Sequence, residues 1–120
     1  MSCIEMQVVP VKSGGLNRVA FECDCELSSI SVGNWILIPD EVDSVVVTFS
    51  NTDSAGGKVQ ATSNVVADVR ADSDVVAVDW DLGEVTETVQ DVCYPPTAIR
   101  LIQTTLGGGS GTTKIYVRAQ

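Results

Sequence analysis

Apolar and polar residues alternate with a period of two along most of this 120-residue chain. Such a period places successive side chains on opposite faces of a β-strand, whereas an amphipathic helix has a period of 3.6 residues. Residues 44–50 show the alternation clearly, because Val45, Val47 and Phe49 fall on one face. Valine and threonine are common and aromatic residues are few, which also favours strands. The sequence therefore predicts an all-β protein.

Turn-forming residues divide the chain into short segments with β-strand character. The segments are residues 3–11, 18–25, 27–32, 35–38, 44–50, 58–62, 65–69, 75–81, 84–92, 97–105 and 112–119. We expect 44–50 and 58–62 to form a hairpin across the loop residues between them. Strands with one apolar and one polar face are typical of antiparallel sheets that pack one face on the core and expose the other to solvent. The expected architecture is a single-domain antiparallel β-sandwich or jelly roll of roughly 9–11 short strands over residues 1–120.

The C-terminal region, residues 96–120, also reads as a β-hairpin. Its arms, 97–105 and 112–119, flank a glycine-rich loop. Two registers put the apolar residues of both arms on one face. Pairing Leu101 with Val117 sets Arg100 opposite Arg118, whereas pairing Leu101 with Ile115 does not, and we expect the second because like charges repel.

The same region reverses the charge of the chain. Residues 1–91 contain 4 basic and all 16 acidic residues, for a net charge of −12, whereas residues 92–120 contain only basic charges, for +3. We expect Arg100, Lys114 and Arg118 to form one basic stripe, with Tyr116 beside Lys114 and Arg118 on the polar face of their strand. These four residues are the candidate interface, and the stripe should meet acidic residues, most usefully across a subunit boundary.

Composition excludes several classes of function. The net charge of −9 and the pI near 4.1 argue against a nucleic-acid partner, because DNA and RNA are bound by Lys and Arg side chains. No run approaches the roughly 20 apolar residues of a membrane span, and residues 1–5 do not begin a secretory signal, so we expect synthesis in a cytoplasm and no membrane partner. Histidine is absent, which removes the usual general base. We expect neither an enzyme nor a cofactor.

Two groups of residues have side chains that bind metals. The acidic group is Asp68, Asp72, Asp74, Asp79, Asp81 and Glu84, and the thiol group is Cys3, Cys23, Cys25 and Cys93. The acidic group lacks the EF-hand spacing, so we interpret its members as turn residues and a solvated face, with a calcium site as the open alternative. The spacing of Cys23 and Cys25 is not the Cys-x-x-Cys of zinc sites, and we interpret the cysteines as small buried hydrophobes. We expect no functional metal.

Aromatic rings that stack on sugars would indicate a carbohydrate site. The candidates are Trp35, Trp80, Tyr94 and Tyr116. Trp80 alternates with Val76 and Val78, so we expect it to be buried in the core, whereas Tyr94 and Tyr116 are better placed to be exposed. Exposed rings beside acids in a groove would favour sugar binding, whereas a flat apolar patch would favour assembly.

The whole chain resembles the small, acidic, Val/Thr-rich β-proteins that tailed bacteriophages carry as decoration, cement or other minor structural proteins. The stretches that show the resemblance are Val9-Pro-Val-Lys-Ser-Gly14, Val46-Val-Thr-Phe-Ser-Asn51, Pro96-Thr-Ala-Ile-Arg-Leu101 and Lys114-Ile-Tyr-Val-Arg-Ala-Gln120. The resemblance is one of overall style, and it assigns no family site to any residue. It implies a β-sandwich that binds a symmetric protein lattice or forms a homo-oligomer, with a trimer favoured.

The expected function is that of a non-enzymatic structural protein of a virus particle. It would be made in the host cytoplasm, become part of the virion, and bind a capsid protein or neighbouring subunits through protein surfaces. The alternative is a carbohydrate- or receptor-binding module such as a tail-fibre tip domain.

Overall fold

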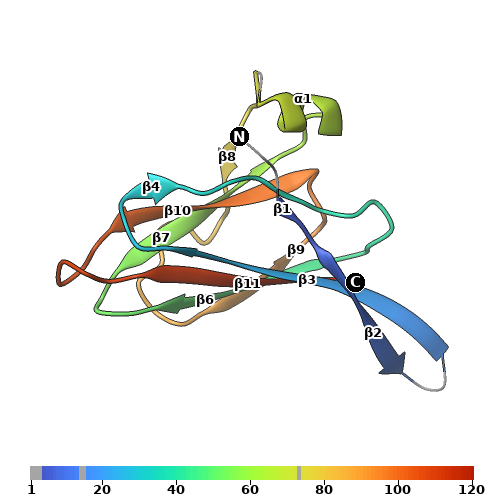
Figure 1. Ribbon diagram of the computed structural model, residues 1–120, viewed down its shortest axis with the longest axis horizontal. Coiled ribbons are helices and arrows are strands. Elements are labelled where there is room, and N and C mark those ends of the chain that lie inside the picture. Colours follow the sequence, from blue (N-terminus) through green and yellow to red (C-terminus); the bar gives the residue numbers. More distant parts are fainter. Residues whose placement is uncertain (1–3, 14–15, 73) are drawn as a thin grey trace.

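Two β-sheets packed face to face form the body of the protein, as the computed structural model shows for residues 4–13, 16–72 and 74–120 (Figure 1). The first, called here the β10 sheet, has the order β1 (Ile4–Glu5), β5 (Ile36–Leu37), β10 (Ala98–Thr105), β7 (Gly56–Thr62) and β8 (Val78–Asp79), with β4 (Ser31–Val32) also beside β10. The second, the β11 sheet, has the order β2 (Gln7–Ser13), β3 (Leu16–Leu27), β11 (Thr113–Ala119), β6 (Val45–Asn51) and β9 (Gln90–Cys93). The predicted β-sandwich is therefore confirmed.

The core lies between the two sheets and follows the alternation of the sequence. In β6, Val45, Val47 and Phe49 are buried and the residues between them are half-buried. In β11, the strand next to β6, Ile115 and Val117 are likewise buried, and Tyr116 between them is exposed. The full set of buried core residues is Phe21, Ile36, Ile38, Val42, Val45, Val47, Phe49, Val59, Val85, Ile99, Leu101, Ile115, Val117 and Ala119.

The predicted C-terminal hairpin is wrong. β10 pairs with β7, β4 and β5, whereas β11 pairs with β3 and β6 in the other sheet, so neither of the two expected registers exists. The predicted hairpin of residues 44–50 with 58–62 is wrong for the same reason, because β6 and β7 also lie in different sheets. The apolar faces of the arms point into one core from opposite sides, which satisfies the sequence pattern as well as a hairpin does.

The glycine-rich loop carries the chain from one sheet to the other. It lies against the β6–β7 connection, where the Gly108 amide donates a 2.9 Å hydrogen bond to the Asp53 carbonyl. Gly107 has φ +62°, and a Cβ atom there would lie 2.1 Å from the Asp53 carbonyl oxygen. At Gly111 a Cβ atom would lie 2.6 Å from the Cβ of Ala55. The glycines therefore let two crossing connections pack together at one end of the sandwich.

The segment 65–69, predicted as a strand, instead begins a helix, α1 (Val66–Ala71), with Val65 as the extended residue before it. The helix ends at Asp72, which has φ 51° and whose backbone amide bonds back to the carbonyls of Asp68 and Val69. Val69 is 1% exposed and forms a second small core with Trp35, Leu37 and Ala98 on the outer side of the β10 sheet. An apolar run this short is compatible with a strand or a helix, and the packing of Val69 against Trp35 favours the helix.

Other segments differ from expectation in extent. Residues 3–11, predicted as one strand, supply β1 to the first sheet and β2 to the second, while Cys3 lies outside the described residues. Residues 84–92 contribute only Gln90 onward to β9, and Val85 forms an isolated bridge with Gly57. The turn-forming glycines Gly14 and Gly15, which separate the predicted segments 3–11 and 18–25, also lie outside the described residues. Among the described residues no helix has the length and apolar character needed to span a membrane.

Candidate binding sites

The predicted basic stripe does not form, because its members lie on opposite outer faces of the sandwich. Arg100 is on β10, and Lys114 and Arg118 are on β11, each at a position that alternates with buried core residues. The stripe depended on β10 pairing with β11, so it fails together with the hairpin. The structure keeps Lys114, Tyr116 and Arg118 on one face, as predicted, and removes Arg100 from them.

Lys114 and Arg118 meet acids within the chain. Arg118 Nη1 pairs with Glu22 Oε1, and Lys114 Nζ lies 3.5 Å from Asp24 Oδ2, with both acids on the adjacent strand β3. Tyr116 and Asp24 hold the pKa of Lys114 above its ordinary value of 10.5. The outer face of the β11 sheet therefore carries paired charges rather than an unpaired basic stripe.

Two rows of outward-facing side chains cross the β11 sheet from strand to strand. The first row is Gln7, Glu22, Arg118, Val46 and Val92, and the second is Asp24, Tyr116, Thr48 and Gln90. Tyr116 lies in the middle of the sheet and is 48% exposed, as its place in the strand predicted. The Lys114 ammonium is 4.8 Å from the centroid of its ring. The strand register, which is not local in sequence, assembled these rows.

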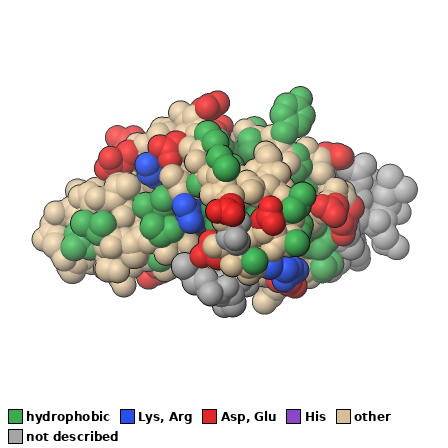
Figure 2. Space-filling model, turned by 90° about the horizontal axis from the view of Figure 1, so that it is seen from above, with side chains coloured by type: hydrophobic (Ala, Val, Ile, Leu, Met, Phe, Trp, Pro, Cys, Tyr) green, Lys and Arg blue, Asp and Glu red, His purple; other side chains and the backbone are tan. Residues whose placement is uncertain are grey.

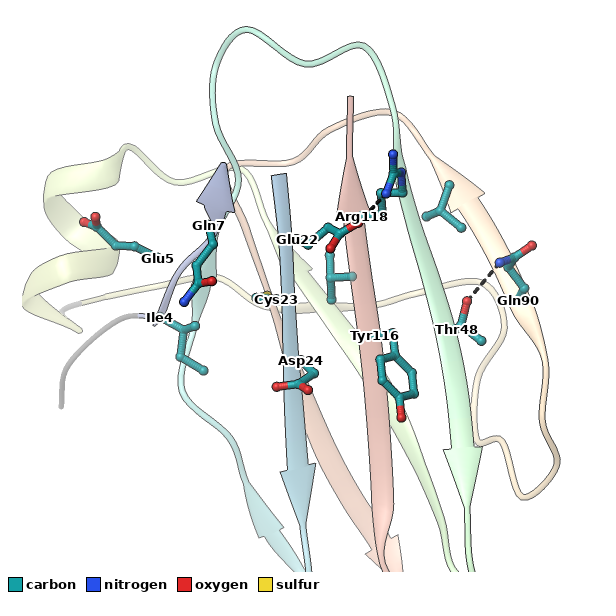
Figure 3. A pocket seen from close by; sticks show the side chains of 12 residues that line it. Ile4, Glu5, Gln7, Glu22, Cys23, Asp24, Thr48, Gln90, Tyr116 and Arg118 are labelled. Atoms are coloured by element: carbon teal, nitrogen blue, oxygen red, sulfur yellow. Dashed lines mark hydrogen bonds and ion pairs between the residues drawn. The ribbon is translucent and has the colours of Figure 1, made fainter. Parts of the chain in front are cut away.

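A groove with a volume of about 780 Å³ lies on this face, with residues of β1 and β2 along one side (Figure 3). Its polar lining comes from β1, β2, β3, β6, β9 and β11, and consists of Glu5, Gln7, Glu22, Asp24, Thr48, Gln90, Tyr116 and Arg118. The Gln90 amide donates a 2.9 Å hydrogen bond to Thr48 Oγ1. Of the candidate interface residues only Tyr116 and Arg118 line the groove. The sequence did not identify the other lining residues, because alternation shows which side chains of a strand point outward but not which strands are neighbours.

Arg100 belongs to a polar network on the outer face of the β10 sheet. Its guanidinium donates two hydrogen bonds to Gln60 Oε1, at 2.9 and 3.0 Å, and lies 4.4 Å from the centroid of the Trp35 ring. Gln60 in turn donates to Asp79, which also pairs with Lys58 at 3.0 Å. These hydrogen bonds from Gln60 and Lys58 lower the pKa of Asp79. Arg100 thus joins strands of its own sheet.

Four exposed valines gather where α1 and β8 meet the edge of the β10 sheet. They are Val65, Val66, Val76 and Val78, with exposed fractions of 64%, 38%, 67% and 63%, and are called here the valine patch. The Asn64 side chain holds the two parts together, because its Oδ1 accepts a 3.0 Å bond from the Val76 amide. Val76 and Val78 had been expected to share a buried face with Trp80, and that prediction is wrong. The two-residue strand β8 lies at the edge of the β10 sheet, where no described residue covers Val76 and Val78.

Acidic side chains are numerous in the segment that carries most of the valine patch. Asp68, Asp72, Asp74, Asp79, Asp81 and Glu84 are all exposed. Viewed from the side that carries α1, hydrophobic side chains reach the surface in several places with acidic ones among them (Figure 2). Residues 64–84 contain these six acids and a single base, Arg70, whose guanidinium pairs with Glu5 at 2.8 Å. Within the described parts of the chain, no three acidic or cysteine side chains are grouped to hold a metal ion.

The remaining aromatic and thiol candidates lie elsewhere. Trp35 is buried and Tyr94 is 92% exposed, away from the groove. Trp80 is half-buried against the core and donates a 2.7 Å hydrogen bond to Asp91, so its predicted burial is only partial. The cysteines of the described residues, Cys23, Cys25 and Cys93, are free thiols packed against the core.

Comparisons with known proteins extend only to solved structures, since no family model and no curated protein matches the chain. A cupin domain from Bordetella pertussis Tohama I is 9% identical, with 100% of this chain and 98% of that chain covered and a TM-score of 0.42. PliG of Aeromonas hydrophila, a periplasmic inhibitor of g-type lysozyme, is 14% identical, with 99% and 96% covered and a TM-score of 0.45. Both likenesses are distant, with TM-scores below 0.5, so function has to be argued from the surfaces of this chain.

Proposed function

We propose that this protein is a non-enzymatic structural protein of a virus particle, of the decoration or cement type, and that it binds a capsid protein through the valine patch. The observation that supports the proposal is the patch itself. Val65, Val76 and Val78 are each more than 60% exposed, and the hydrogen bond from the Val76 amide to Asn64 brings the segment before α1 beside the segment before β8. Contiguous apolar surface bounded by polar residues is typical of protein interaction sites. Covering it removes apolar area from water, at roughly 25 cal/mol per Å².

Charge favours a partner that differs from this chain. A second copy placed symmetrically on the valine patch would bring two rims of six acids together, and like charges across an interface are unfavourable. A head-to-tail copy would need free basic side chains, but among the side chains that the structure describes Lys58, Arg70, Lys114 and Arg118 are already in ion pairs. A capsid protein with basic residues around an apolar surface fits the patch better. The homo-oligomer, with a trimer favoured, stays a prediction and would use another surface.

Substitution of the patch tests this function. Particles of the encoding virus, prepared without this protein, are mixed with the purified chain and sedimented. Val65→Thr/Val76→Thr/Val78→Thr should weaken co-sedimentation at least about tenfold, because three exposed apolar side chains lose the methyl groups that the partner would bury. Threonine keeps the β-branched shape, so the fold should be unaffected.

The control is the pair Val8→Thr/Val92→Thr, which changes valines of similar exposure, 61% and 57%, outside the patch. This pair should bind like the parent, and parent binding should weaken as sodium chloride is raised. Equal binding by the triple variant would remove the patch from the interface. Failure of the parent itself to bind the particles would overturn the role in the virion.

A further inference from the structure

The groove on the β11 sheet is nearly neutral although the chain is strongly acidic. The three acids that line it, Glu5, Glu22 and Asp24, are each in an ion pair, with Arg70, Arg118 and Lys114 respectively. An anionic ligand would find no unpaired base there, and a cationic ligand would have to compete with existing partners. The charges of the groove therefore favour an uncharged ligand.

The polar side chains of the groove suit a ligand with many hydroxyl groups. Gln7 and Gln90 each offer an amide donor and an amide acceptor, and the carboxylates of Glu22 and Asp24 accept from several directions. The Gln7 side chain makes no hydrogen bond to any described residue. A sugar hydroxyl can donate one hydrogen bond and accept another, so two neighbouring hydroxyls can bond to both atoms of an amide or carboxylate group. Sites that bind small molecules likewise combine apolar surface with a few well-placed polar groups.

Tyr116 supplies the apolar surface. Its ring stands in the middle of the sheet beside the groove, with Asp24 and Thr48 as its cross-strand neighbours (Figure 3). The ammonium group of Lys114, which does not line the groove, lies 4.8 Å from the ring centroid. An aromatic ring exposed among hydrogen-bonding groups packs against the C–H face of a pyranose while its neighbours bind the hydroxyls. The volume, about 780 Å³, falls within the range of about 300–1,000 Å³ of small-molecule sites.

We propose that this groove binds an uncharged oligosaccharide that crosses the sheet, with one sugar ring against Tyr116 beside Asp24 and with further sugar units reaching Gln7 on one side and Gln90 on the other. The proposed glycan and capsid contacts use different residues, because the groove is on the outer face of the β11 sheet and the valine patch lies at the α1 side of the β10 sheet. A structural protein anchored by one face would present the other to a glycan.

The test begins with the full chain on an immobilised array of neutral and acidic oligosaccharides from bacterial, plant and animal glycans. The parent should bind a set of neutral glycans. Titration calorimetry with the best of them should show an affinity loss of at least about tenfold for Tyr116→Ala and a smaller loss for Gln7→Ala. Tyr116→Phe should bind nearly as the parent does, because stacking needs the ring and not its hydroxyl.

Tyr94→Ala is the matched control, since Tyr94 is 92% exposed and outside the groove, and it should leave affinity unchanged. Circular dichroism checks that every variant is folded. The proposal is overturned if the parent binds no glycan on the array, if it binds only charged glycans, or if Tyr116→Ala binds as tightly as the parent. The valine-patch triple variant should still bind the glycan, and Tyr116→Ala should still bind particles, so failure of one proposal leaves the other intact.

Discussion

Cys23 shows how the place of one residue in a strand sets its chemistry. It alternates with Glu22 and Asp24 on β3, so its thiol packs against the core while the two carboxylates face the groove. Burial, with the nearby Cys25 and Asp24 as smaller causes, raises the pKa of Cys23 from 9.0 to about 12. The thiol therefore stays protonated and behaves as a small apolar group, in line with its interpretation from the sequence.

The raised pKa of Cys23 predicts that folding stability falls with pH above 9. In the unfolded chain the thiol ionises near 9.0, whereas the folded protein keeps the proton to about 12. The native state then binds more protons in this window, so the free energy of unfolding decreases as pH rises through it. Urea unfolding with a reductant, at about pH 8 and about pH 10.5, should show a smaller decrease for Cys23→Ala than for the parent. An identical decrease in both would mean that the thiol ionises in the fold as it does in the unfolded chain.

At the scale of elements, the connections between strands decide the architecture. The β6–β7 and β10–β11 connections both pass from one sheet to the other, and they are hydrogen-bonded side by side. The Thr52 amide donates to the Thr112 carbonyl at 3.0 Å, and the Thr112 amide donates to Thr52 Oγ1 at 3.0 Å. These contacts hold the two sheets together at one end of the sandwich.

Gly107 and Gly83 form a matched pair that tests this packing. Both have φ near +60°, but a Cβ atom at Gly107 would overlap the backbone of Asp53, whereas one at Gly83 would meet nothing within 4 Å. Gly83→Ala should cost about 1 kcal/mol of unfolding free energy, the strain of a left-handed alanine. Gly107→Ala should cost at least about 2 kcal/mol more, because the two connections must separate.

Urea denaturation of the parent and both variants measures the difference. Equal losses for the two alanines would show that the connections do not pack tightly against each other. A loss confined to Gly83→Ala would contradict the contact between Gly107 and Asp53 altogether.

For the whole molecule, charge is unevenly distributed between the two faces. On the β11 face Lys114 and Arg118 are paired with acids, whereas residues 64–84 on the α1 side carry six exposed acids and one base, Arg70, and of these acids Asp79 is paired with Lys58 of β7. With a net charge of −9, this repulsion acts against the folded state unless salt screens it or a basic partner covers it. The uncompensated charge is thus on the side proposed to bind a capsid protein.

Raising sodium chloride from about 10 to about 200 mM should therefore raise the melting temperature, by about 2–5 °C, because exposed charges are screened beyond the Debye length. Asp72→Asn/Asp74→Asn should reduce the rise. Both residues have φ slightly above +50°, a conformation that asparagine adopts readily, so the change removes charge without altering the backbone. Thermal unfolding followed by circular dichroism gives both values. A melting temperature that falls with salt would mean that the surface ion pairs outweigh the repulsion.

The sequence by itself determined the β-sandwich and the direction of most side chains along its long strands. Val47 and Val117 point inward and Tyr116 points outward, because the alternation of a strand depends only on its own residues. The face of Lys114, Tyr116 and Arg118 could be predicted for that reason. Where a strand is only two residues long, as at Val78, the same pattern misled, because alternation does not say whether anything covers a face.

Only the tertiary structure decided which strands are neighbours. Strand pairing joins residues far apart in sequence, such as Leu101 with Val59 and Tyr116 with Asp24. A glycine-rich loop can turn back into a hairpin or cross to the opposite sheet, and both outcomes bury the same apolar faces. The choice separated Arg100 from Lys114, turned Val66–Ala71 into a helix over Trp35, and assembled the groove from six strands. These features depend on packing across the molecule, which no local pattern contains.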